Sequence, residues 1–476
     1  MSKKFIKDFS IYGVGGIVSK FVGIITAPIY TRLLSTEGYG LLDLMTSISA
    51  ILIIFTTMEM HSGYSRSYYE ARDGGQLEQL RGSVMLFFIM AYIVLIFLFS
   101  IFSSQLEQRI TLFNINLVLP VIIGLFPKMI IILTQVTLRY EKKPVYFSVI
   151  SIGNLVLTAI GGIFAVTYLD LGVRGILWSN AIVSFIVSFI LLTTLFKYTR
   201  FNFNINYLKE TVLYSVPIVP AVLGSWLNNY IGRIFIAGAL SLSSLGIYSI
   251  ALKVGLLMTL ANGAFKLTWS PRANKLFTQK GSESQFANIL NYYLFGFSIL
   301  VILIVTASPL IVNILAPEKF YPAISIIGIL TVGLFWDGAK NIIGSGNNWV
   351  RKTYYNSIAS ISGGIINILI LYFFIKTGGV VVAAIGFTLG SIIQAILLLL
   401  TAQRNHYISY SITNLLLSLI LLLGYSLISY YSFQSLNLFS FMAIHFLVGI
   451  VILVVMYYII LNADERKTCM NYIKFS

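Results

Sequence analysis

Apolar runs of about twenty residues follow one another along the entire sequence, and short polar turns separate them. Each run is long enough to cross the hydrocarbon core of a bilayer as a helix. No polar stretch between two runs is long enough to form a soluble domain. We therefore predict an all-α polytopic membrane protein with about fourteen transmembrane helices, at residues 9–33, 41–62, 83–103, 116–138, 147–168, 174–196, 211–237, 246–268, 287–308, 322–345, 355–375, 380–402, 412–432 and 441–462.

The first predicted span carries small residues and one lysine on a single helical face. Gly13, Gly16, Lys20, Gly23 and Ala27 recur at spacings of three and four residues, which places them on one side of a helix. Small residues allow another helix to approach closely in lipid. A lysine near the middle of a bilayer is costly unless it faces the protein interior or a water-filled cavity. We therefore expect Lys20 to point inward, and we expect this run to be a retained span rather than a cleaved signal.

A weak internal repeat links the two halves of the chain. RLLSTEGYGLLDL at residues 32–44 aligns with GALSLSSLGIYSI at residues 238–250, and both contain a Leu-Ser pair and a later glycine. The span before the second copy is interrupted by Pro217 and Pro220 and carries Arg233. Interrupted, charged helices at matching places in two halves point to the binding site of a transporter.

The composition supports a membrane protein, and the charge distribution supports an orientation. The chain is 58% hydrophobic and 10% charged, with a formal net charge of +16. If the N-terminus lies inside, most loop cations fall on the side of both termini, and the opposite side holds Arg32, Arg109, Arg174, Lys319 and Lys376. This bias follows the positive-inside rule. We therefore expect cytoplasmic N- and C-termini, and the positive charge does not require a nucleic-acid partner.

Ionisable residues also occur within the predicted spans, and most of them are cations. The cations are Lys20, Lys128, Arg233, Lys253, Lys266 and Lys340. Lys266 lies near a span end, where a long side chain can snorkel to the interface. The acids are Asp43, Glu59 and Asp337.

Asp337 and Lys340 are three residues apart on one predicted helix, so they can partly neutralise each other. The interior then keeps an excess of positive charge, which suits an anionic ligand. The alternative for the neutral polar residues is that they only join helices to one another. We favour a functional role for Lys20, Arg233 and Lys253, because ionisable residues within spans are functional candidates by default.

No pattern of residues indicates catalysis, a metal site or a cofactor. The chain has no Walker loop, because GSGNN at residues 344–348 lacks the Lys-Ser/Thr that would follow. His61, His406 and His445 are far apart and have no Cys or carboxylate at metal-ligand spacing. No Ser-His-Asp arrangement has supporting context. We therefore predict a transport protein and not an enzyme.

Several segments resemble one known family. They are GVGGIVSKFVGIITAPIYTRLLSTEGYGLLDL near the N-terminus, LSSLGIYSIALKVG after the seventh span, FKLTWSPRANKLF at residues 265–277 and ILAPEKFYPAISIIGIL at residues 314–330. Together they resemble the Wzx-type oligosaccharide flippases of the multidrug/oligosaccharidyl-lipid/polysaccharide (MOP) exporter superfamily. The resemblance extends over most of the chain, but its motifs are diffuse and do not specify a substrate.

The resemblance implies two six-helix lobes around a central cavity, and the fourteen predicted spans add a C-terminal helix pair. The corresponding parts of this chain are residues 1–205, 206–410 and 411–476. It also implies alternating access in the bacterial inner membrane, with undecaprenyl-pyrophosphate-linked sugar units carried to the outer leaflet for O-antigen or capsule synthesis. Polysaccharide polymerase and chain-length proteins are the implied protein partners.

The resemblance further suggests roles for individual residues. The pyrophosphate would contact Lys20, Arg233 and Lys253, with Lys128 and Lys340 as second choices. The sugars would face Trp226, Asn229 and Trp336. A coupling proton or sodium ion would bind Asp43, Glu59 or Asp337, or the membrane potential would act on the anionic headgroup.

Three alternatives remain at this point. A peptidoglycan lipid II flippase is one, because fourteen spans match that group better than the twelve usual for Wzx-type proteins. A cation-coupled multidrug exporter of the same superfamily is another, although such an exporter is expected to have acids in its cavity where this chain has Lys20. A scaffolding subunit of an envelope-synthesis complex is the third.

Overall fold

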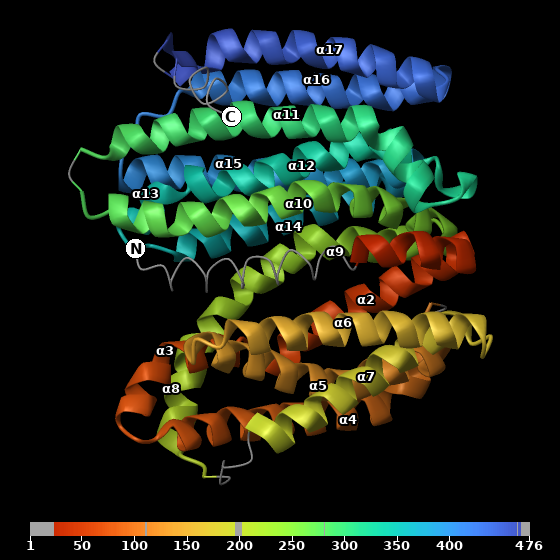
Figure 1. The fold of residues 1–476 in the computed structure, drawn as a ribbon, viewed down its shortest axis with the longest axis vertical. Helices are drawn as coiled ribbons and strands as arrows, with labels where there is room; N and C mark the ends of the chain where they lie inside the picture. The colour runs from red at the N-terminus through yellow and green to blue at the C-terminus, as the bar shows by residue number, and fades with distance from the viewer. Residues whose placement is uncertain (1–22, 110–111, 196–201, 280, 464, 468–476) are drawn as a thin grey trace. The chain divides into compact units, whose positions relative to one another are not determined.

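The computed structural model describes residues 23–109, 112–195, 202–279, 281–463 and 465–467 (Figure 1). These residues form helices and turns, with no strand among them. Thirteen of the described helices are long and apolar enough to cross a membrane. The prediction of an all-helical polytopic membrane protein is therefore confirmed. The first predicted span lies largely outside the described residues, which include its last part as a helix at residues 23–33.

The chain forms two compact units. The first unit comprises Met1–Trp226 together with Ser241–Leu245, and the second comprises Leu227–Leu240 together with Gly246–Ser476. The transition between the units therefore falls within one interrupted helix and the start of the next. The division into residues 1–205, 206–410 and 411–476 remains a prediction.

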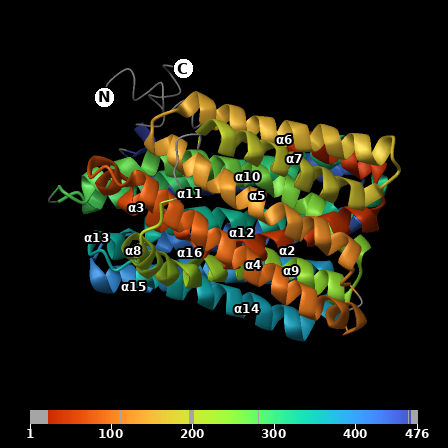
Figure 2. The same ribbon diagram turned by 90° about the horizontal axis from the view of Figure 1, so that it is seen from below.

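The first unit is a bundle of helices that includes a short, amphipathic member. In the second view α5 and α7 lie side by side, with α6 beside them (Figure 2). The helices are α2 (Thr36–Thr57), α3 (Met60–Asp73), α4 (Leu77–Arg109), α5 (Ile115–Tyr140), α6 (Pro144–Thr167), α7 (Gly172–Leu195) and α8 (Ile205–Ser215). The amphipathic member is α3, which buries Tyr64 and Tyr68 against α4 and α5.

The second predicted span, residues 41–62, ends earlier than its hydropathy suggested. Met58 and Glu59 have left-handed backbone angles, with φ of 41° and 58°. Such angles cannot continue a right-handed helix. The spanning helix α2 therefore ends at Thr57, and α3 begins separately at Met60.

A polar cluster fixes α3 to its neighbours. Arg81 Nε donates to the Tyr64 hydroxyl at 3.2 Å, and Arg81 pairs with Glu141 at 2.7 Å. Lys143 Nζ lies 2.8 Å from the same Glu141 carboxylate. Burial alone would raise the pKa of Glu141, but the bonds and charges from Lys143 and Arg81 hold it below its ordinary value. Glu141 therefore stays ionised and joins α4 to the end of α5.

The interrupted seventh span and the helices after it complete the chain. Pro217 and Pro220 fall where α8 gives way to a 3₁₀ turn, because a proline removes a helical N–H donor. The elements are η1 (Val216–Ile218), α9 (Val219–Ala239), α10 (Leu242–Leu276), α11 (Glu283–Leu315), η2 (Glu318–Phe320), α12 (Ala323–Ile343), α13 (Ser345–Trp349), α14 (Tyr354–Gly378), α15 (Val380–Asn405), α16 (Ile412–Ser435) and α17 (Leu438–Ile460).

Within the second unit, α16 and α17 lie side by side against α11 (Figure 1). In the same unit, α14 and α15 form a hairpin. Only Gly379 separates them, and its φ of 66° favours glycine. Gly363 allows these two helices to approach, because a Cβ atom there would meet the backbone carbonyl of Gly390 at 2.6 Å.

The internal repeat of the sequence corresponds to a repeated helix start. Ser35 Oγ accepts a hydrogen bond from Gly38 N at 3.0 Å at the start of α2. Ser241 Oγ accepts the same kind of bond from Ser244 N, also at 3.0 Å, at the start of α10. A serine in this position satisfies a backbone N–H that has no partner within the helix. The shared Leu-Ser pair therefore encodes a turn between two helices in each half.

The contact between α3 and α8 depends on a glycine and generates a prediction. Gly63 N donates to Ser215 Oγ at 3.1 Å, and a Cβ atom at Gly63 would lie 2.6 Å from that oxygen and 2.7 Å from the Thr211 carbonyl oxygen. We expect Gly63→Ala to force α3 and α8 apart and to cost about 1–3 kcal/mol of stability. The measurement is thermal unfolding of the purified protein in detergent.

The matched control is Gly153→Ala in α6, where an added Cβ atom has no neighbour within 4 Å. Alanine is the better helix former by about 0.5–1 kcal/mol, so this variant should unfold at the wild-type temperature or above. Equal unfolding temperatures for the two variants would contradict the predicted close packing at Gly63.

Candidate functional site

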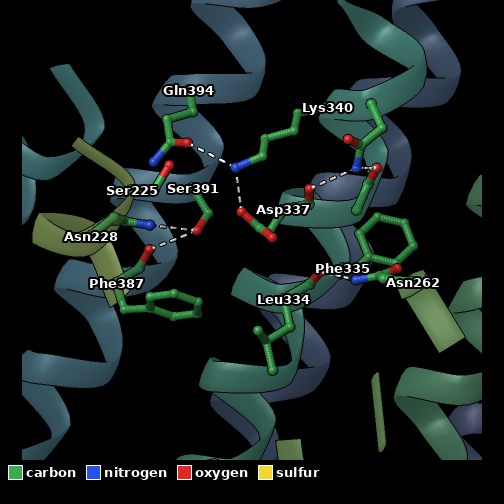
Figure 3. Close-up of polar contacts among 12 residues, drawn as sticks. Ser225, Asn228, Asn262, Leu334, Phe335, Asp337, Lys340, Phe387, Ser391 and Gln394 are labelled. Atoms are coloured by element: carbon green, nitrogen blue, oxygen red, sulfur yellow. Dashed lines mark hydrogen bonds and ion pairs between the residues drawn. The ribbon is translucent and has the colours of Figure 1, made fainter. Parts of the chain in front are cut away.

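The second unit contains a polar cluster around Lys340 (Figure 3). One turn of α12 presents both Asp337 and Lys340, which form an ion pair. Lys340 Nζ also donates to Gln394 Oε1 on α15 at 3.0 Å. The pairing of Asp337 with Lys340 was predicted from their spacing, whereas the contribution of Gln394 was not. The cluster joins α12 to α15 and neutralises the lysine charge.

A second group of polar side chains joins α9, α14 and α15. Asn228 Nδ2 donates to Ser391 Oγ at 3.1 Å, and Asn367 Nδ2 donates to the Asn228 carbonyl oxygen at 2.9 Å. The Oδ1 atoms of Asn228 and Asn367 are buried and have no partner among the described residues. Sequence reasoning missed this group, because only the polar character of each residue within an apolar run could have indicated it.

A third set of bonds fixes α10 and α11 to α12. Asn262 Nδ2 donates to the Leu334 carbonyl oxygen at 2.8 Å (Figure 3). The Tyr293 hydroxyl lies 2.9 Å from both Asn262 Oδ1 and the Phe335 carbonyl oxygen. The accepting carbonyls belong to the helical turn directly before Asp337, so these bonds support the part of α12 that presents the ion pair.

Arg233 lies on α9, one turn after Asn229. Its Nη1 atom donates to the Asn229 carbonyl oxygen at 2.6 Å, and its guanidinium carbon lies 4.6 Å from the centre of the Tyr230 ring. The Asn229 residue is exposed, and Arg233 is half-buried. Arg233, the predicted pyrophosphate contact, and Asn229, the predicted sugar contact, are therefore neighbours on α9. Lys253 is half-buried on α10, and Lys20 lies outside the described residues.

Lys128 lies in the first unit and faces a cavity of about 350 Å³. Its Nζ atom donates to Ser49 Oγ on α2 at 3.2 Å. Among the described residues, the cavity is lined by side chains of α2, α5, α6 and α7, which belong to the first unit. Lys128 and Lys340 therefore occupy separate environments in separate units.

The two tryptophans that were predicted to contact sugars are both buried. Trp226 is 5% exposed, and its Nε1 atom donates to the Ser47 carbonyl oxygen at 3.3 Å within the first unit. Trp336 is also 5% exposed, and its Nε1 atom has no hydrogen-bond partner among the described residues. Of the three predicted sugar contacts, only Asn229 is exposed.

The three acids of the spans have different surroundings. Asp43 is half-buried on α2, and its backbone carbonyl accepts a bond from Ser47 Oγ at 2.8 Å. Glu59 lies at the break between α2 and α3, 3.4 Å from His61 Nε2 and 3.1 Å from Ser62 Oγ. Burial lowers the pKa of His61. The charge of Arg139 lowers this pKa further, whereas the charge of Glu59 raises it. Within the described chain, no three His, Cys, Asp or Glu side chains gather as a metal site would require.

Comparison with known sequences identifies the family. A profile of the family described as Polysaccharide biosynthesis protein matches residues 5–277. Lsg locus protein 1 of Haemophilus influenzae is 24% identical over 300 residues, which cover 58% of this chain and 68% of that protein.

Several solved structures have a similar fold. Lipid II flippase MurJ in an inward closed conformation has a TM-score of 0.72 at 18% identity, covering 94% of this chain and 97% of its own. An outward-facing multidrug resistance transporter of the MATE family has a TM-score of 0.62 at 13% identity, covering 84% and 95%. A MOP superfamily transporter from Pyrococcus furiosus, described as having a binding pocket of reverse polarity, has a TM-score of 0.59 at 14% identity, covering 84% of this chain and 95% of its own.

These structures belong to transporters and flippases by name, and at such identities they establish the fold. Their folds agree with the all-helical membrane architecture that was predicted from the sequence. Since the family profile covers more than half of the sequence, this chain belongs to the polysaccharide biosynthesis protein family.

Proposed function

We propose that this protein carries undecaprenyl-pyrophosphate-linked oligosaccharide units from the inner to the outer leaflet of the bacterial inner membrane. The observation that carries the proposal is Arg233, a cation within a predicted span and beside exposed Asn229, in a member of the polysaccharide biosynthesis family. A cation within a membrane span is a functional candidate by default. The ligand that suits it here is an anion attached to a sugar.

The chemistry of Arg233 suits a pyrophosphate. A guanidinium group has five N–H donors in a planar fork, which matches phosphate oxygens two at a time. Its bond to the Asn229 carbonyl oxygen orients this fork along α9. The neighbouring Asn229 amide has both donors and acceptors, which is what sugar hydroxyls require. Lys253 on α10 and Lys20 would add point charges to the same anion.

Lys128 and Lys340 are less suited to this role than the sequence suggested. Lys340 already pairs with Asp337 and donates to Gln394, so its charge is neutralised within the second unit. Lys128 is enclosed in a cavity of the first unit. The proposal for the pyrophosphate therefore rests on Arg233 and Lys253, with Lys20 as its third member.

Alternating access is the proposed mechanism, and its energy source forms part of the proposal. The membrane potential acts on an anionic headgroup with about 2.3 kcal/mol per charge per 100 mV. Proton or sodium coupling through Asp43, Glu59 or Asp337 is the other source. Asp337 is the best of these candidates, because protonation of its carboxylate would break the ion pair with Lys340, the residue that bonds α12 to Gln394 on α15.

Lipid II transport is a second candidate substrate, supported by the TM-score of 0.72 with a lipid II flippase. Multidrug export is a third candidate, supported by the similarity to a MATE transporter. The excess of cations in the spans weighs against the export of organic cations.

Polysaccharide polymerase and chain-length proteins are the proposed partners of the flippase.

The first prediction concerns the anion contact. We expect Arg233→Ala and Lys253→Ala each to reduce transport by about tenfold or more, because a hydrogen bond to a charged group contributes about 1.5–3 kcal/mol. The readout is the amount of lipid-linked oligosaccharide that accumulates in cells carrying each variant as the only copy. Exposed Lys275 on α10 provides the control, and Lys275→Ala should transport normally. If Arg233→Ala and Lys253→Ala both transport normally, the anion-contact proposal is wrong.

The substrate class is tested by mass spectrometry of lipid extracts from cells with and without the protein. Accumulation of a prenyl-pyrophosphate oligosaccharide in the deleted strain is the expected result and would identify the sugar. Accumulation of lipid II would move the assignment to the peptidoglycan precursor. Unchanged lipids with increased sensitivity to cationic dyes would instead favour a drug exporter.

The coupling role of Asp337 gives a further prediction. Asp337→Asn keeps the shape of the side chain but cannot ionise, so transport by this variant should fall and should no longer respond to an ionophore that dissipates the proton gradient. Glu318→Gln in η2, which is exposed, is the control and should keep the ionophore response. An unchanged ionophore response in Asp337→Asn would exclude Asp337 as the coupling residue.

A further inference from the structure

The cavity of the first unit surrounds a lysine that the pyrophosphate proposal does not use. The cavity has a volume of about 350 Å³ and lies among α2, α5, α6 and α7. Lys128 is half-buried in the unit and lines this cavity. It directly follows Pro127, which cannot donate the helical hydrogen bond to the carbonyl of Ile123.

The charge of Lys128 has no acidic partner in the described part of the chain. Its one hydrogen bond there is to the neutral Ser49 Oγ at 3.2 Å. The described residues that line the cavity include neither Asp nor Glu. By contrast, Lys340 pairs with Asp337 and Arg81 pairs with Glu141. A buried cation without a counter-charge is strongly destabilising. The arrangement therefore favours a negative charge that the described residues of the unit do not provide.

Neutral polar groups in the cavity are suited to an anion. The Ser49 hydroxyl accepts from Lys128, which leaves its own hydrogen for another acceptor. Asn180 Oδ1 accepts from Ser184 Oγ at 3.5 Å, which leaves the two amide hydrogens of Asn180 available for the cavity. Asn154 Oδ1, also in the lining, is buried without a partner in the described chain, as expected where cavity water supplies the donor.

We propose that this cavity binds one small monovalent anion of the chloride type, held by Lys128 Nζ, the Ser49 hydroxyl and the Asn180 amide. One such anion neutralises one lysine, whereas a pyrophosphate would bring more negative charge than this single cation can balance. The volume exceeds that of the bare ion, so water molecules complete its coordination. The site lies within one unit and is independent of the proposed transport function.

The test uses the full chain purified in detergent, with radioactive chloride as the ligand and sodium gluconate maintaining the ionic strength. We expect saturable binding of about one chloride per chain, and a thermal unfolding temperature that rises with chloride, since a ligand of the folded state stabilises it. Lys128→Met removes the charge but keeps an apolar chain of similar length. This variant should lose both chloride binding and the chloride dependence of unfolding.

The control is Lys266→Met, which replaces an exposed lysine of α10 and should behave as the wild-type protein. If Lys128→Met does not fold, Ser49→Ala provides the second variant, and its chloride affinity should fall several-fold. The proposal is overturned if wild-type protein binds no chloride saturably. It is also overturned if Lys128→Met, or Ser49→Ala in its place, binds chloride as the wild-type does. Each of these results leaves the lipid-extract test of transport unaffected.

Discussion

A polar group within the apolar interior of a membrane protein must find its partner inside the protein, and this constraint organises both units. Outside a hydrated cavity, no water is available there to satisfy an unpaired donor or charge. In the second unit the constraint produces bonds between helices, from Lys340 to Gln394 and from Asn228 to Ser391. In the first unit it produces the bond from Lys128 to Ser49. The polar residues thus decide which helices are neighbours, while the apolar residues determine only that the helices are buried.

The same constraint explains how much of the structure could be predicted from the sequence. The spans were predictable because a run of about twenty apolar residues favours a membrane-crossing helix whatever its tertiary contacts are. The end of α2 at Thr57 was not predictable, because it depends on the backbone angles of Met58 and Glu59 rather than on hydropathy. The Asp337–Lys340 pair was predictable because both residues lie on one helix, three positions apart. The partners of Asn228 were not, because Ser391 and Asn367 lie on other helices, more than a hundred positions away.

The cations of the spans illustrate how one residue type can serve different purposes in one chain. Lys340 is neutralised by an acid on its own helix and stabilises the contact between α12 and α15. Lys128 faces a cavity whose lining lacks acids among the described residues. Arg233 is held along α9 by the Asn229 carbonyl oxygen. From the sequence alone, each of the three is a charged residue that is costly to place within an apolar span. Only the surroundings of each residue show whether its charge is structural or can receive a ligand.

The hairpin of α14 and α15 has a practical consequence for studies of motion. A single residue, Gly379, connects the two helices, and Gly363 brings their backbones close together. Helices joined so tightly cannot slide or separate without breaking their packing. Probes attached to both helices should therefore report a constant separation throughout a transport cycle. The distance between α14 and α15 can therefore serve as a fixed reference for spectroscopic distances that change elsewhere in the protein.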